Sequence, residues 1–77
     1  MTLDELSLAT PAHVRAVTGA PARRERLTEL GFTPGVRVSV AGRAPLGDPI
    51  HVELRGGGFA VRRDEARCIE VAPETGA

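Results

Sequence analysis

The clearest pattern in the chain is a strict alternation of apolar and polar residues at positions 50–55. Ile50, Val52 and Leu54 alternate there with polar side chains, and this two-residue period predicts a strand with one face in a core. Three valines repeat the period at residues 36–40. Weaker versions predict three further strands, at residues 13–18, 59–62 and 69–71. Five short strands at close spacing favour a mainly β structure and a small barrel, because closure leaves no exposed strand edges.

Residues 22–30 depart from this pattern with a run of helix-forming residues, in which Leu27 and Leu30 lie three apart on one side. Pro21 suits the first helical position because its missing N–H needs no partner there. Gly31 follows directly, where a helix C-cap favours glycine. The sequence therefore predicts one short α-helix with a narrow apolar stripe.

Glycine and proline predict the tight turns. Pro34 and Gly35 occupy the second and third positions of a type II turn that precedes the valine-rich strand. A run of three glycines begins with Gly56 and Gly57, and we expect it to form a hairpin turn because glycine adopts positive φ at no steric cost. These glycines and Pro34 are therefore interpreted as structural.

The two ends of the chain and one further turn complete the prediction. Asp64 is expected to cap a single helical turn at residues 65–67. Residues 72–77 are expected to form a frayed tail. Three leucines near the N-terminus are expected to contact the core: Leu3, Leu6 and Leu8.

Composition narrows the class of protein. A chain of 77 residues is expected to form one domain, residues 1–77, and a hydrophobic content of 42% suits a globular fold. Ten arginines balance ten acidic residues, so there is no general attraction to nucleic acid or anionic lipid. Phe32 and Phe59 are the only aromatic residues, and both fall at expected core positions. Base stacking and recognition of proline-rich peptides, which need exposed aromatic rings, are therefore not expected.

The location of the protein follows from its N-terminus and its apolar runs. Acidic residues stand near the N-terminus where a signal peptide needs basic ones. The apolar runs are only a few residues long, against about 20 for a membrane-spanning helix. We therefore expect a cytoplasmic protein that does not insert into the membrane.

Catalysis and cofactor binding are not expected. His13 and His51 fall on different predicted strands, and neither has a nucleophile at a spacing typical of a triad. Cys68 has no cysteine or histidine at metal-ligand spacing, so it is interpreted as a packing residue. The sequence predicts a binding protein with no cofactor and no metal site.

One loop is a candidate binding surface. The hexapeptide Ala-Pro-Leu-Gly-Asp-Pro precedes the clearest strand, and Pro45 and Pro49 flank Leu46, Gly47 and Asp48. Two prolines limit the freedom of the loop, and a stiff loop loses less entropy on binding. The alternative is that Leu46 folds inward and Asp48 caps its own turn.

The outer side of the predicted helix is a second candidate binding surface. Arg23 and Arg26 lie there. The alternative is a solvated face on which these arginines pair with neighbouring acidic residues.

Three segments together resemble the ferrous-iron transport protein A (FeoA) family. They are Arg-Leu-Thr-Glu-Leu-Gly-Phe-Thr-Pro-Gly at 26–35, the hexapeptide at 44–49, and Leu-Arg-Gly at 54–56 followed by residues 60–66 and Ile69. The likeness extends from about Thr2 to Val71. Val61 replaces the leucine usual in the family, and Ala12 replaces a common glycine; both changes affect packing or a turn.

The resemblance implies an SH3-like barrel and a cytoplasmic accessory role in ferrous-iron uptake. The implied partner is the cytoplasmic part of a membrane ferrous-iron permease with a G-protein-like domain. The family is also associated with transition-metal-ion binding, so a direct iron carrier is one alternative. Because this domain type occurs in metal-dependent repressors, another is an interaction module acting on an iron-dependent transcription regulator. A homo-oligomer is compatible with the sequence.

Overall fold

The computed structural model describes residues 1–74. Its elements in chain order are η1 (Leu3–Glu5), β1 (Ala12–Val17), α1 (Pro21–Leu30), β2 (Arg37–Arg43), β3 (Ile50–Leu54), β4 (Gly57–Val61), α2 (Arg63–Ala66) and β5 (Ile69–Pro73). The structure is therefore mainly β, with five strands and one longer helix, as the alternation of apolar residues predicts.

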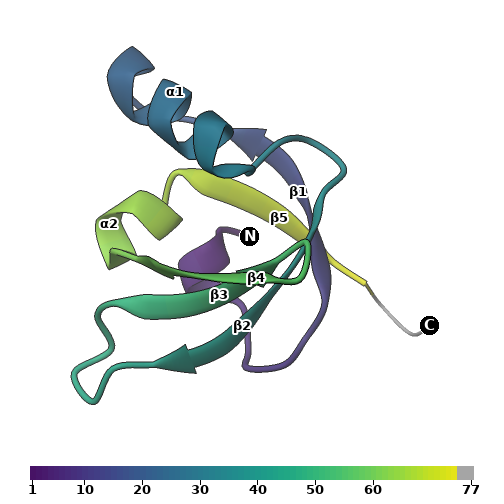
Figure 1. Cartoon of the computed structure of the whole chain (residues 1–77), viewed down its shortest axis with the longest axis vertical. Helices are drawn as coiled ribbons and strands as arrows, with labels where there is room; N and C mark the ends of the chain where they lie inside the picture. Colours follow the sequence, from purple (N-terminus) through teal and green to yellow (C-terminus); the bar gives the residue numbers. More distant parts are fainter. Residues whose placement is uncertain (75–77) are drawn as a thin grey trace.

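The five strands form one curved antiparallel sheet in the order β4-β3-β2-β1-β5 (Figure 1). β4 and β5 are its two edges, and α2 connects them in the chain. The two edge strands are not paired with each other, so α2 stands where continuous barrel hydrogen bonding would have closed the sheet. This arrangement brings α2 against η1, at the other end of the chain.

The core lies on the inner face of the sheet. Alternate residues of β3 are buried, with Leu54 only 4% exposed. Phe32 is fully buried, and Leu3 and Leu6 of the N-terminal segment complete the core as expected. Leu8 does not, because its side chain is 57% exposed. The chain there pairs with Val40 through an isolated backbone bridge, which leaves the Leu8 side chain in solvent.

The end of α1 follows the prediction. Gly31 has a left-handed φ of 116°, and its N–H reaches the carbonyl oxygens of the last helical turn. The type II turn is also present, with Gly35 at φ 91° and a hydrogen bond of 3.1 Å from the Val36 N–H to the Thr33 carbonyl oxygen. These two turns flank Phe32 and place its side chain in the core.

The β3–β4 hairpin differs from the prediction by one residue. Leu54 pairs with Gly57, so the turn consists of Arg55 at φ 51° and Gly56 at φ 77°. Gly56 is a turn residue as expected, whereas Gly57 belongs to β4. A one-residue shift in register would move the buried side chains of β4 to the solvent face, so the pairing of the strands determines the turn.

The cap of α2 and the C-terminal strand also differ from expectation. Arg62, not Asp64, occupies the N-cap of α2. Ala72 pairs with His13 and Pro73 with Ala12, so these two residues extend β5 and are not a tail. The rest of the expected tail, residues 75–77, lies outside the described residues.

Candidate partner-binding surface

The loop between β2 and β3 is closed by its own backbone. β2 continues to Arg43, beyond the strand predicted at 36–40, and the loop begins at Ala44. The Gly47 N–H donates to the Ala44 carbonyl oxygen at 2.7 Å, which closes a turn at residues 44–47. The Ala44 N–H donates to the Pro49 carbonyl oxygen at 3.0 Å, and the Asp48–Pro49 peptide bond is cis. The two backbone hydrogen bonds leave the loop little freedom at its base.

Leu46 forms the tip of this loop. Its side chain is 93% exposed, so it does not fold inward. Asp48 does not cap its own turn; its Oδ1 accepts a hydrogen bond of 3.0 Å from the backbone N–H of Arg63, the first residue of α2. The loop that presents Leu46 is therefore tied to a second element. Single exposed leucines are common, but one held out on a braced loop is suited to binding.

Arg23 and Arg26 connect the two helices. Arg23 lies 3.3 Å from the Asp64 carboxylate, and Arg26 lies 2.7 Å from the Glu65 carboxylate. The Cys68 side chain, and to a lesser extent the charge of Asp64, raise the pKa of Arg23. Glu65 is buried and also accepts a hydrogen bond of 3.0 Å from the Arg62 N–H. The structure thus uses both arginines to join α1 to α2, through ion pairs between residues about 40 positions apart.

Arg62, which the sequence interpretation did not single out, lies beside this loop. It is exposed, and among residues 1–74 its guanidinium has no ion-pair partner. It lines a shallow hollow of about 360 Å³ together with Asp48, Pro49 and Ala60. The local sequence does not distinguish Arg62 from the arginines near it. The pairing of β3 with β4 places Arg62 beside the loop.

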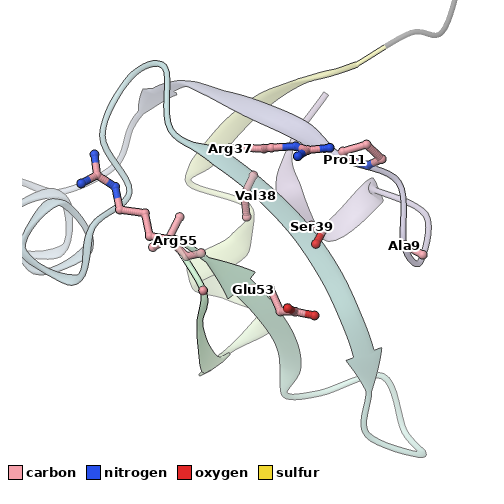
Figure 2. Close-up of a pocket in the computed structure, with 9 residues that line it drawn as sticks. Ala9, Pro11, Arg37, Val38, Ser39, Glu53 and Arg55 are labelled. Carbon is pink, nitrogen blue, oxygen red and sulfur yellow. The ribbon is translucent and has the colours of Figure 1, made fainter.

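A second hollow, of about 400 Å³, lies over β2 and β3 near the hairpin turn. Figure 2 shows Arg37, Ser39 and Glu53 on these strands, with Arg55 at the turn. Arg37 is already paired with Glu74 at 3.1 Å. The remaining groups are solvated and of mixed charge, which indicates no particular ligand.

A third hollow, of about 780 Å³, lies between α1 and β1. It also carries charges of both signs, from arginines and glutamates that face solvent. Its lining residues are Arg15, Ala16, Val17, Pro21, Arg24, Glu25, Thr28, Glu29, Phe32 and Pro34.

The histidines and the cysteine are dispersed. His13 contacts Glu74 at 3.4 Å, His51 is exposed on β3, and Cys68 packs partly against the core. Within residues 1–74, no group of three or more His, Cys, Asp or Glu side chains is placed to hold a metal ion. Neither helix of this part of the chain has the length and hydrophobicity needed to span a bilayer.

Comparison with known proteins shows the family. The FeoA domain family model matches residues 1–73, so the chain belongs to the FeoA family, which is associated with ferrous-iron transport. It is 35% identical over 71 residues to an Fe(2+) transport protein A/Fe(2+) transporter FeoB fusion protein of Porphyromonas gingivalis. The match covers 92% of this chain but only 8% of that fusion protein.

Solved structures support the same assignment. The solution structure of FeoA from Chlorobium tepidum is 42% identical, with a TM-score of 0.90 over 100% of this chain and 73% of that one. The crystal structure of Stenotrophomonas maltophilia FeoA, complexed with zinc and described as an SH3 domain protein, is 38% identical, with a TM-score of 0.82 over 94% of this chain and 89% of that one. The SH3-like fold is thereby confirmed. The crystal structure of T. acidophilum IdeR is similar in fold alone, at 17% identity and a TM-score of 0.82 over 96% of this chain and 34% of that one.

Proposed function

We propose that this chain is an accessory protein that binds the cytoplasmic part of a membrane ferrous-iron transporter and modulates uptake. The observation that carries the proposal is the Porphyromonas gingivalis relative, in which a FeoA part and the transporter FeoB are one polypeptide. Fusion gives two domains a high effective concentration for each other. A separate chain needs a binding surface to reach the same arrangement.

The surface geometry supports this proposal. The β2–β3 loop presents Leu46 to solvent from a base held by backbone hydrogen bonds and by the contact of Asp48 with α2. Such a loop loses little conformational entropy when a partner covers it. In this proposal the chain acts as one domain in the cytoplasm, by binding and without catalysis, and the G-protein-like part of the transporter is the docking partner.

Ferrous-iron uptake in cells tests the proposal. Cells that lack this chain are expected to take up ferrous iron at an altered rate, and expression of the chain is expected to restore the wild-type rate. Transcripts of iron-regulated genes are measured in the same cells as a control. Unchanged uptake together with altered transcription would contradict the proposal and favour the alternative, an action on a transcription regulator.

A further inference from the structure

We infer that Leu46 and Arg62 form one docking surface, which takes an apolar pocket bordered by carboxylates on the partner protein. The partner is the transporter of the proposed function, so this inference rests on that proposal. It adds the chemistry of the contact. The inference follows from where the sheet places the loop, which arginines the fold leaves unpaired, and how exposed the leucine is.

The sheet places Arg62 beside the loop. In the β3–β4 ladder Ile50 pairs with Val61, so the residues just beyond this pair, Pro49 and Arg62, lie opposite each other. Both line the hollow of about 360 Å³ at the base of the loop. The hydrogen bond of 3.0 Å between Asp48 and the Arg63 N–H fixes this side of the loop to α2. Arg62 therefore lies beside the braced base of the loop whose tip is Leu46.

Some of the charged residues in and beside α2 form ion pairs within residues 1–74, and others do not. Its two acidic residues are both paired with arginines of α1, and the arginine that follows α2 approaches an acidic residue of the N-terminal segment. These pairs are Asp64 with Arg23, Glu65 with Arg26, and Arg67 with Asp4 at 3.7 Å. Arg62 and Arg63 are both exposed and have no such partner among residues 1–74. The fold thus neutralises its acidic groups here and leaves positive charge at the surface.

Leu46 and Arg62 together define the complementary surface. A leucine that is 93% exposed gains most by entering an apolar pocket, and a central apolar contact supplies affinity. The Arg62 guanidinium, at the border of this apolar contact, pairs best with a carboxylate, which it can contact through two N–H groups. Such border charges also set orientation and association rate. An apolar pocket with carboxylates at its edge satisfies both groups at once.

The test uses the full-length transporter in nanodiscs and the full 77-residue chain. Arg62→Glu reverses the charge of an exposed side chain that makes no hydrogen bond or ion pair within residues 1–74. Arg24→Glu is the matched control: it makes the same charge change at an exposed arginine of α1 that is also unpaired among these residues. Thermal melting of each variant checks that the fold is retained.

We expect Arg62→Glu to weaken binding by about tenfold or more at low salt, because it opposes carboxylates with a carboxylate. Arg24→Glu is expected to change binding by less than about twofold. Added salt should weaken wild-type binding more than binding of Arg62→Glu, because screening removes an attraction that the variant has lost.

The outcomes separate this inference from the proposed function. If wild-type chain binds the transporter and Arg62→Glu binds equally well, the docking surface is wrong and the proposed function stands. An equal loss in Arg24→Glu would also overturn it, because net charge or the α1–β1 hollow would then be responsible. If the wild-type chain does not bind at all, the proposed function fails, and this inference fails with it.

Discussion

The carboxylate of Asp48 accepts a hydrogen bond of 3.0 Å from the backbone N–H of Arg63. The two residues are 15 positions apart, and the contact joins the β2–β3 loop to the first residue of α2. The first N–H groups of a helix have no partner within the helix, so a carboxylate there has the same effect as a capping residue. A loop residue that looks like a candidate contact for a partner is thus also a structural residue.

Asp48→Ala is expected to destabilise the fold by about 1 kcal/mol, because the Arg63 N–H loses its partner. For a chain of this size the loss corresponds to a melting temperature lower by about 4–8 °C. Thermal unfolding followed by circular dichroism measures it.

Asp48→Asn is the control, since its amide oxygen can still accept the hydrogen bond. It should retain most of the stability that Asp48→Ala loses. If Asp48→Ala melts at the wild-type temperature, the contact with α2 contributes nothing.

Gly31→Ala is expected to destabilise the fold by about 1–3 kcal/mol, since a φ of 116° strains any residue with a Cβ. The added Cβ would also lie only 3.0 Å from a methyl carbon of Leu54. Gly42→Ala is the control, because Gly42 lies in β2 at ordinary φ with no neighbouring atom within 4 Å of the added carbon. Urea unfolding of both variants measures the difference, and similar losses would contradict the strain at Gly31.

Leu54→Ala is expected to destabilise the fold by about 2–5 kcal/mol through loss of contacts and the cavity left behind. Leu54 is 4% exposed on the inner face of β3. Leu46→Ala makes the same chemical change at a side chain that is 93% exposed and should leave the unfolding midpoint unchanged. Equal midpoints for the two variants would refute the placement of β3 against the core.

Glu65→Ala is expected to cost about 1–3 kcal/mol of folding free energy, because it removes the acceptor of the Arg62 N–H and the partner of Arg26. Glu65 is 6% exposed, so water does not readily replace these contacts. Glu25→Ala, at an exposed glutamate of α1, is the control and should change stability by less than about 0.5 kcal/mol. A wild-type melting temperature for Glu65→Ala would show that the α1–α2 connection is energetically neutral.

Local patterns predicted the parts of the fold that depend on local physics. The alternation at Ile50, Val52 and Leu54 predicted β3, and Gly31 predicted the end of α1. The hairpin turn lies one residue before the predicted position, because strand pairing and not the glycine run decides that Arg55 adopts positive φ. Leu8 was wrongly assigned to the core because alternation does not show how a lead-in segment lies against a sheet.

The candidate site was predicted less completely than the fold. The loop from Pro45 to Pro49 was recognised by its composition, and the exposure of Leu46 is consistent with the binding hypothesis. The contact of Asp48 with α2 and the pairing of Arg23 with Asp64 depend on tertiary approach across many residues, which no spacing in the sequence reports. The position of Arg62 beside the loop likewise depends on the pairing of β3 with β4.

Titration of the full-length transporter in nanodiscs with the wild-type chain and with Leu46→Ala shows whether the β2–β3 loop binds the transporter. Leu8→Ala, at another exposed leucine, is the control. We expect the wild-type chain to bind and Leu8→Ala to bind equally well. Leu46→Ala should bind about five- to thirtyfold more weakly, as expected for about 1–2 kcal/mol of lost apolar burial. If the wild-type chain does not bind, or if Leu46→Ala binds with wild-type affinity, then Leu46 does not dock this chain on the transporter.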